Sequence, residues 1–130
     1  MRLAADLPPL PPVLADRLML EQVLLNLIRN GMDAMSATPA ARRVLRISAE
    51  RRADEVVISI TDNGCGIAPE VRDKLFTAFF STKPEGMGIG LSICRSIIEF
   101  HRGRLWAEDN STAADRSGTI FSFTLPLDSA

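Results

Sequence analysis

Two groups of alternating glycines constrain this chain more than any other feature. The first reads DNGCG at residues 62–66, after a strand-like run, and the second reads GMGIGL at residues 86–91, where a helix-like run begins. Alternating glycines leave main-chain amides bare and allow positive φ, so a ligand can approach the backbone closely. An acidic side chain suits a base that carries an amino group, and amides at a helix N-terminus suit phosphates. The two groups therefore predict one ligand with a base at one end and phosphates at the other.

The composition indicates one globular domain. The chain has 130 residues, of which 46% are hydrophobic and 24% are charged, and this is enough for a single core. A net charge of −1 gives no electrostatic basis for binding nucleic acid or a membrane surface. Cys65 and Cys94 are too few for a disulfide framework, and no signal peptide or membrane span is visible. We therefore expect residues 1–130 to form a cytoplasmic domain that is monomeric in isolation.

Hydrophobic residues that recur at helical spacing predict three helices. The first begins after the N-cap Asp16 and runs to about Met35. A short helix covers residues 69–76, and a third covers residues 89–101 and ends before Gly103. The first helix has a buried stripe of Leu20, Val23, Leu24, Leu27, Gly31, Ala34 and Met35, and a polar stripe of Gln22, Asn26, Asn30 and Asp33.

Alternating polar and apolar residues predict the strands of a sheet. Because side chains alternate along a strand, Asp62 lies on the same face as Ile60 and points into the layer that the strand buries. Prolines within residues 7–12 exclude a helix there. The polar outer faces favour a two-layer α/β sandwich, with a mixed, mostly antiparallel sheet of about five strands covered on one face by about three helices. The predicted strands are residues 2–4, 13–15, 44–50, 56–61, 104–108 and 119–125.

Asn26 and Asn30 are unusual residues for the interior of a helix. The asparagine amide competes for backbone hydrogen bonds, so two of them on one face beside Asp33 disfavour the helix. They form either a solvated polar face or a site where an amide oxygen ligates a hard cation. Mg²⁺ fits the second interpretation, because it takes few protein oxygens and completes its shell with water and substrate phosphates.

Each glycine group has other interpretations when it is taken alone. The group at 62–66 is also compatible with a tight turn at a strand end. The group at 86–91 matches neither the dinucleotide fingerprint nor a P-loop. Lys83 is either a solvated surface residue or a charge clamp for phosphates. His101, the only histidine, lies at a predicted helix C-terminus, where we expect a capping role and not a catalytic one.

Taken together, these motifs resemble the catalytic and ATP-binding domain of sensor histidine kinases, in the wider GHKL family that includes DNA gyrase, HSP90 and MutL. The resemblance implies the Bergerat fold and covers the chain from about Asp16 to Leu125. The run Thr82-Lys83-Pro84 is similar to a subgroup of PAS-linked sensor kinases. The motifs that carry the resemblance are NLIRNGMDA at 26–34 (N box), DNGCG at 62–66 (G1 box), LFTAFFSTK at 75–83 (F box), GMGIGL at 86–91 (G2 box) and the pair Gly118-Thr119.

The resemblance implies ATP and Mg²⁺ as cofactors. Asp62 would accept a hydrogen bond from the adenine amino group, and Asn30 would hold Mg²⁺ with Asn26 beside it. Lys83 would reach the phosphates, and residues 67–90 would form a flexible lid that orders on ATP. Thr119 would support Asp62 or a bridging water. The other residues implied at the nucleotide are Asp33, Gly64, Gly66, Ile67, Phe79, Thr82, Gly86, Gly88, Ile89, Gly90 and Leu91.

The implied function is transfer of the ATP γ-phosphate to a histidine. The phosphoacceptor motif is absent, so the acceptor is expected on a separate dimerisation domain of the same or a sister chain, with a response regulator downstream. Alternatives are an ATPase of the gyrase type, a protein-serine kinase of the anti-sigma type, or a degenerate binding module. Asn26 stands where the family's ATPases carry a glutamate base, and this favours transfer over hydrolysis. Asp33 stands where many histidine kinases carry a cationic side chain that contacts phosphate. Lys83 would therefore neutralise more of the phosphate charge in this chain.

Overall fold

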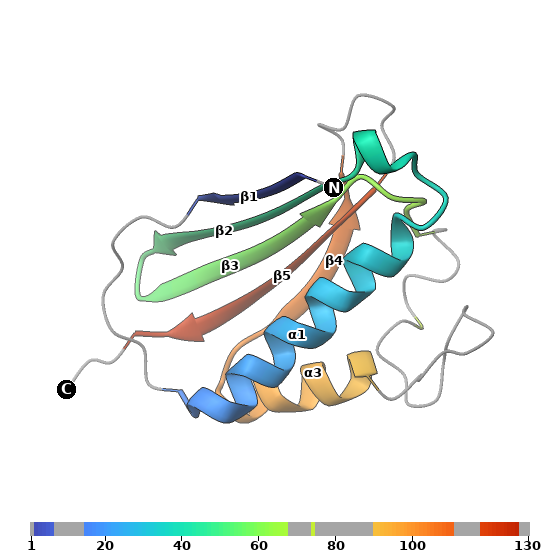
Figure 1. Cartoon of the computed structure of the whole chain (residues 1–130). Coiled ribbons are helices and arrows are strands. Elements are labelled where there is room, and N and C mark those ends of the chain that lie inside the picture. The colour runs from blue at the N-terminus through green and yellow to red at the C-terminus, as the bar shows by residue number, and fades with distance from the viewer. Residues whose placement is uncertain (1, 7–14, 68–73, 75–89, 111–117, 128–130) are drawn as a thin grey trace.

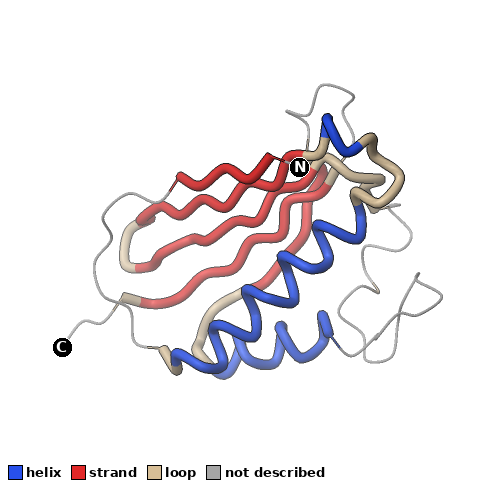
Figure 2. Tube along the Cα trace, viewed as in Figure 1, coloured by secondary structure: helices blue, strands red, loops and turns tan. Residues whose placement is uncertain are grey.

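The structure, a computed structural model, describes residues 2–6, 15–67, 74, 90–110 and 118–127. Its described part has two layers, with one sheet and two α-helices that lie across one of its faces (Figures 1 and 2). The strand order is β1-β2-β3-β5-β4. β1 pairs with β2 in parallel and the other pairs are antiparallel, so the predicted fold class is confirmed. The elements are β1 Arg2–Asp6, α1 Arg17–Ala34, the 3₁₀ turn η1 Ala40–Arg42, β2 Val44–Arg52, β3 Glu55–Asp62, α3 Gly90–Phe100, β4 Leu105–Asp109 and β5 Thr119–Pro126.

Some predicted elements fall outside this description. The short helix at 69–76 lies outside the described residues except for residue 74, and so does the predicted strand at 13–15 except for Ala15, which is in no strand. The edge strand predicted at 2–4 is confirmed, and it extends to Asp6. Neither of the two described α-helices is long and apolar enough to cross a membrane.

Helix α1 begins where the sequence predicts. The Asp16 carboxylate accepts a hydrogen bond of 3.0 Å from the Met19 N–H, and so caps a free amide of the first turn. The predicted apolar stripe faces the sheet, with Val23, Leu27 and Gly31 buried. Burial of this stripe, more than helix propensity, holds α1 on the sheet.

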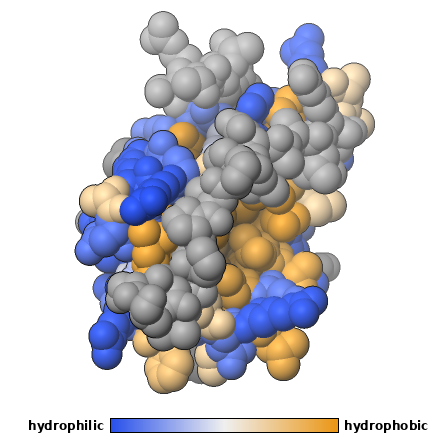
Figure 3. Space-filling model, turned by 90° about the vertical axis from the view of Figure 1, so that its left-hand side faces the viewer, coloured by the Kyte–Doolittle hydropathy of each residue, from blue (hydrophilic) through white to orange (hydrophobic). Residues whose placement is uncertain are grey.

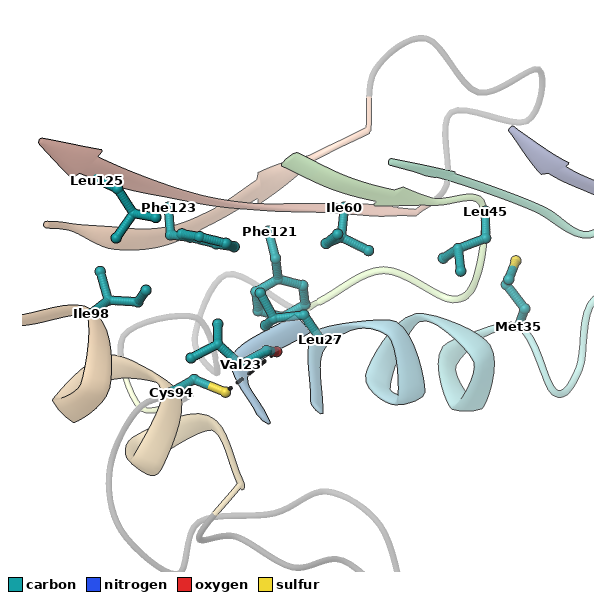
Figure 4. Close-up of a cluster of buried hydrophobic side chains, with 10 residues drawn as sticks. All are labelled: Val23, Leu27, Met35, Leu45, Ile60, Cys94, Ile98, Phe121, Phe123 and Leu125. Carbon is teal, nitrogen blue, oxygen red and sulfur yellow. Dashed lines mark hydrogen bonds between the residues drawn. The ribbon is translucent and has the colours of Figure 1, made fainter. Parts of the chain in front are cut away.

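The sheet register sets the direction of the side chains at the predicted site. Leu45 lies directly opposite Asp62, and Ile47 lies opposite Ile60. Residues that are opposite in a ladder share one face, so Asp62 lies on the face that the helices cover, as its position in the strand predicted. The core between the layers is formed by Val23, Leu27, Met35, Leu45, Ile60, Cys94, Ile98, Phe121, Phe123 and Leu125 (Figure 4).

The opposite face of the sheet is mainly polar, with apolar members such as Val57 and Trp106, and it is not fully solvated. Ser122 and Thr124 of β5 point away from the core, as predicted, yet both are buried. The Ser122 and Ser59 hydroxyls lie 2.9 Å apart, and the Thr124 hydroxyl accepts a hydrogen bond from the Arg104 N–H. These bonds satisfy the buried hydroxyls.

Figure 3 shows the molecule turned by 90° from the view of Figure 1. On the side that faces the viewer, hydrophobic residues gather in the middle with hydrophilic residues on either side.

Helix α3 is closed at its C-terminus by two main-chain hydrogen bonds. The Gly103 N–H donates to the Ile98 carbonyl and the Arg102 N–H donates to the Glu99 carbonyl, which is the Schellman pattern. Arg102 takes the left-handed φ of 64°, so the glycine is not needed for that conformation. Gly103 is needed for packing, because a Cβ there would lie 1.9 Å from the Thr124 carbonyl oxygen.

His101 binds the end of α3, as predicted, but it does so as a neutral ring. Its Nδ1 lies 2.7 Å from the Ile97 carbonyl, and its Nε2 accepts a bond of 2.9 Å from the Asp16 N–H. A carbonyl only accepts and an amide N–H only donates, so the proton is on Nδ1. His101 therefore links the end of α3 to the beginning of α1.

Candidate functional site

Several segments that are distant in sequence meet at one end of the sheet. Strand β3 ends there at Asp62, β5 begins there at Thr119, and the C-terminal end of α1 lies beside them (Figure 1). The contact between α1 and the chain after β3 is direct, because the Cys65 N–H donates to the Ala34 carbonyl at 3.0 Å. This end of the sheet contains the acid that the sequence singled out.

Asp62 is almost completely buried, with 2% of its surface exposed. Its Oδ1 accepts a hydrogen bond of 2.9 Å from the Gly64 N–H and one of 3.3 Å from the Thr119 N–H. Thr119 thus supports Asp62 through its main chain. The other oxygen, Oδ2, faces Gly31 of α1, where a Cβ would lie 3.6 Å away.

Burial dominates the electrostatics of Asp62. Desolvation raises its pKa above the ordinary 3.8, and the hydrogen bonds from Gly64 and Thr119 lower it in part. A carboxylate in this position gains from any further donor that reaches it, because such a donor replaces the lost hydration. The buried acid therefore has the properties of a recognition group for a ligand N–H.

The glycines around Asp62 allow close backbone packing. A Cβ on Gly64 would lie 2.3 Å from the Ala34 carbonyl oxygen, and a Cβ on Gly118 would lie 2.2 Å from the Asp62 carbonyl oxygen. Gly66 has a positive φ of 75° and is half-buried. Gly64 is thus required by its contact with α1, which the sequence did not indicate.

The polar stripe of α1 divides into residues with different surroundings. Asn26 and Asn30 are half-buried, and Asp33 is exposed. The Asn26 side chain lies close to the thiol of Cys94 on α3, and that thiol donates a hydrogen bond of 3.9 Å to the Val23 carbonyl (Figure 4). Burial raises the pKa of the Cys94 thiol to about 11, and the nearby Asn26 side chain opposes this rise. For Asn26 the structure thus adds a third role, a polar contact between helices, to the two that the sequence left open.

The second glycine group is described only at its end. Helix α3 begins at Gly90, one residue after the predicted start. Leu91 in its first turn and Ile67 after the first glycine group are half-buried and pack against the core. The other predicted residues, Phe79, Thr82, Lys83, Gly86, Gly88 and Ile89, lie outside the described residues, as does most of the segment 67–90 predicted to form a lid.

The structure also identifies two asparagines that the sequence did not single out as site residues. Asn63 accepts a bond from the Val44 N–H at 3.0 Å and donates to the Arg42 carbonyl at 2.7 Å, and so anchors the start of β2. Asn110, after the end of β4, donates to the main-chain carbonyl of Asp62 at 2.9 Å. The only signal for Asn110 in the sequence is its position just after a predicted strand.

Comparisons with known proteins identify the family of this chain. The family model described as histidine kinase-, DNA gyrase B- and HSP90-like ATPase matches residues 15–129. The sensor protein FixL of Bradyrhizobium diazoefficiens is 47% identical over 115 residues, which cover 88% of this chain and 22% of FixL. The chain thus spans about a fifth of the length of this relative.

Solved structures show the same fold. The catalytic domain of the histidine kinase ThkA superposes with a TM-score of 0.81 at 34% identity, over 96% of this chain and 78% of that one. ThkA in complex with the response regulator TrrA gives a TM-score of 0.75 at 32% identity, over 95% of this chain and 33% of that one. Full-length ShkA in complex with AMPPNP gives 0.81 at 28% identity, over 99% of this chain and 26% of that one. From its sequence and its fold, the chain belongs to the family of histidine kinase-, DNA gyrase B- and HSP90-like ATPases.

Proposed function

We propose that this domain binds ATP with Mg²⁺ and donates the γ-phosphate to a histidine on a separate dimerisation and phosphoacceptor domain. The observation that carries the proposal is the buried carboxylate of Asp62 at the end of the sheet, with Oδ1 held by two main-chain amides. Membership of the family, the response regulator bound to ThkA and the ATP analogue bound to ShkA support it.

Asp62 recognises the adenine end of the nucleotide. Because Oδ1 already accepts two N–H groups, Oδ2 is the oxygen that accepts from the exocyclic amino group. Gly31 beside Oδ2 has no side chain to crowd that approach. The desolvation that raises the pKa of Asp62 makes such a bond worth more than it would be in water.

The phosphate end lies toward α1 and the beginning of α3. The amide oxygen of the half-buried Asn30 is the kind of ligand that Mg²⁺ takes. The metal would neutralise phosphate charge when it is bound. Gly90 and Leu91 supply main-chain amides in the first turn of α3, where the helix dipole favours anions. Lys83, Gly86 and Gly88 complete this end in the proposal.

Transfer to a histidine fits these residues better than hydrolysis does. The ATPases that the chain resembles carry a glutamate base at the place of Asn26, whereas a neutral asparagine amide cannot take a proton from water at neutral pH. Asn26 in addition lies beside the Cys94 thiol, whose pKa it lowers. Phosphoryl transfer depends mainly on positioning and charge stabilisation, so an acceptor on another domain is chemically reasonable.

The partners follow from this chemistry. The acceptor domain belongs to the same or a sister chain and brings two kinase chains together, and a response regulator receives the phosphate from its histidine. Since ATP is the donor, the domain functions in the cytoplasm.

The test is a labelling experiment with the whole chain. The domain is incubated with Mg²⁺ and ATP labelled at the γ-phosphate, together with a helical phosphoacceptor domain of a sensor kinase. Label on the acceptor histidine supports the proposal. Label on serine of a protein partner would favour the serine kinase, release of free phosphate alone would favour the ATPase, and failure to bind ATP in calorimetry would overturn all three.

A further inference from the structure

We infer that Asn110 is a positioning residue, which holds the main chain of Asp62 so that its carboxylate points at adenine. This inference rests on the proposed function, because it concerns the same acid. It goes beyond that function because Asn110 lies outside every motif on which the ATP site was predicted. The argument starts from where Asn110 donates its hydrogen bonds.

Asn110 connects three strand ends. Its side-chain amide donates to the Asp62 carbonyl at 2.9 Å, and its main-chain N–H donates to the Gly118 carbonyl at 3.2 Å. In the sheet register Asp62 lies opposite Thr119, and Thr119 lies opposite Asp109. Asn110 is the residue directly after Asp109, so it lies at the same end of the sheet as Asp62. With 5% of its surface exposed, Asn110 makes these bonds away from water.

The bond from Asn110 restrains the main-chain carbonyl of Asp62. The Gly64 and Thr119 amides hold the side chain, whereas Asn110 holds the carbonyl. The orientation of that carbonyl sets ψ of Asp62, and ψ determines where the Gly64 N–H lies relative to Oδ1. If the carbonyl turns, the bond from Gly64 lengthens and the carboxylate loses its direction.

Loss of this restraint affects adenine binding more than phosphate binding. A hydrogen bond weakens steeply with poor alignment, and Oδ2 must meet a donor on a rigid base. The amides of Gly90 and Leu91 belong to α3 and do not depend on the Asp62 carbonyl. Removal of Asn110 should therefore weaken the discrimination between adenine and other bases. It should have little effect on the binding of the phosphates, which all nucleotides share.

The experiment compares two nucleotides that differ at the exocyclic group. Calorimetry on the whole chain measures the affinities for ADP and for IDP, in which an oxygen replaces the amino group. The variants are Asn110→Ala and Asn110→Ser, the second of which keeps a polar group in the buried position. The matched control is Ser122→Ala, which removes a buried hydrogen bond from β5 on the other face of the sheet.

We expect both Asn110 variants to reduce the ratio of ADP to IDP affinity by about tenfold, as for one well-placed hydrogen bond, while Ser122→Ala keeps the wild-type ratio. An unchanged ratio in a folded Asn110 variant would overturn the inference, and so would an equal reduction in Ser122→Ala. If the wild-type chain itself binds ADP and IDP equally, the assignment of Asp62 to adenine fails first, and the two failures are distinguishable.

Discussion

Asp62→Asn should separate nucleotide binding from the stability of the fold. The substitution keeps the shape of the side chain and removes its charge. The amide oxygen of asparagine can still accept from the Gly64 and Thr119 N–H groups that hold Oδ1. What changes is the atom at Oδ2, where an NH₂ donor replaces the acceptor that faces Gly31.

The expected loss of ATP affinity follows from that single atom. One hydrogen bond between adenine and a charged acceptor is removed, and two donors then face each other. A hydrogen bond to a charged group is worth about 1.5–3 kcal/mol, so the affinity for ATP should fall roughly 10- to 100-fold. A second lost bond is not expected, because Oδ1 is already occupied by the protein's own amides.

The stability of the ligand-free domain should change in the opposite direction. Burial raises the pKa of Asp62 above 3.8, so the folded protein holds this proton more tightly than the unfolded chain does. Unfolding then releases a proton between the two pKa values, and the contribution of Asp62 to stability falls as pH rises from about 3.8 through the folded-state pKa. Above that pH the charged side chain lowers stability, and Asp62→Asn should remove this penalty.

Urea denaturation followed by circular dichroism measures the stability, and calorimetry measures the ATP affinity. The charge control is Asp54→Asn, which removes an exposed carboxylate in the turn between β2 and β3. We expect Asp62→Asn to be more stable than wild type at neutral pH, and the difference to shrink as the pH falls. An Asp62→Asn domain that binds ATP like wild type would refute the adenine role, and one that is less stable at neutral pH would refute the electrostatic argument.

Further predictions concern the packing around this site. Gly64→Ala should lower the free energy of unfolding by about 2–4 kcal/mol, because the new Cβ overlaps the Ala34 carbonyl; an unchanged urea midpoint would contradict this contact. His101→Ala should cost about 1–2 kcal/mol in the same assay, since it removes two hydrogen bonds between helix ends, and a neutral result would mean that water replaces them. At about pH 8 a disulfide reagent should modify Cys65 in the native protein and Cys94 only after unfolding, because Cys94 is buried and its pKa is about 11; rapid reaction of both would exclude that burial.

Local patterns predicted the parts of the site that depend on one segment. Alternation along β3 was enough to place Asp62 on the buried face, because side-chain direction has a period of two residues. The cap at Asp16 and the start of α3 near Gly90 also follow from local chemistry. In each case the deciding interaction lies within a few residues of sequence.

Contacts between distant segments could not be predicted in this way. The order β3-β5-β4 brings Asn110 to the Asp62 carbonyl, and no local pattern encodes strand order. The contact of Gly64 with Ala34 depends on how closely α1 approaches the sheet. The contact between Asn26 and Cys94 likewise depends on the packing of two helices, which the polar stripe alone did not reveal.

Two main-chain hydrogen bonds explain how the fold tolerates a buried acid at this position. Desolvation of the charged Asp62 side chain works against folding. The surrounding hydrogen bonds must therefore offset part of this cost without cancelling the negative charge. Main-chain donors from Gly64 and Thr119 do this at Oδ1 without a cation, and they leave the charge for a ligand. A lysine or arginine at that place would stabilise the empty domain more, but in the function that we propose it would compete with the nucleotide for the carboxylate. If Asp62 binds adenine as we propose, its geometry favours the complex over the free protein.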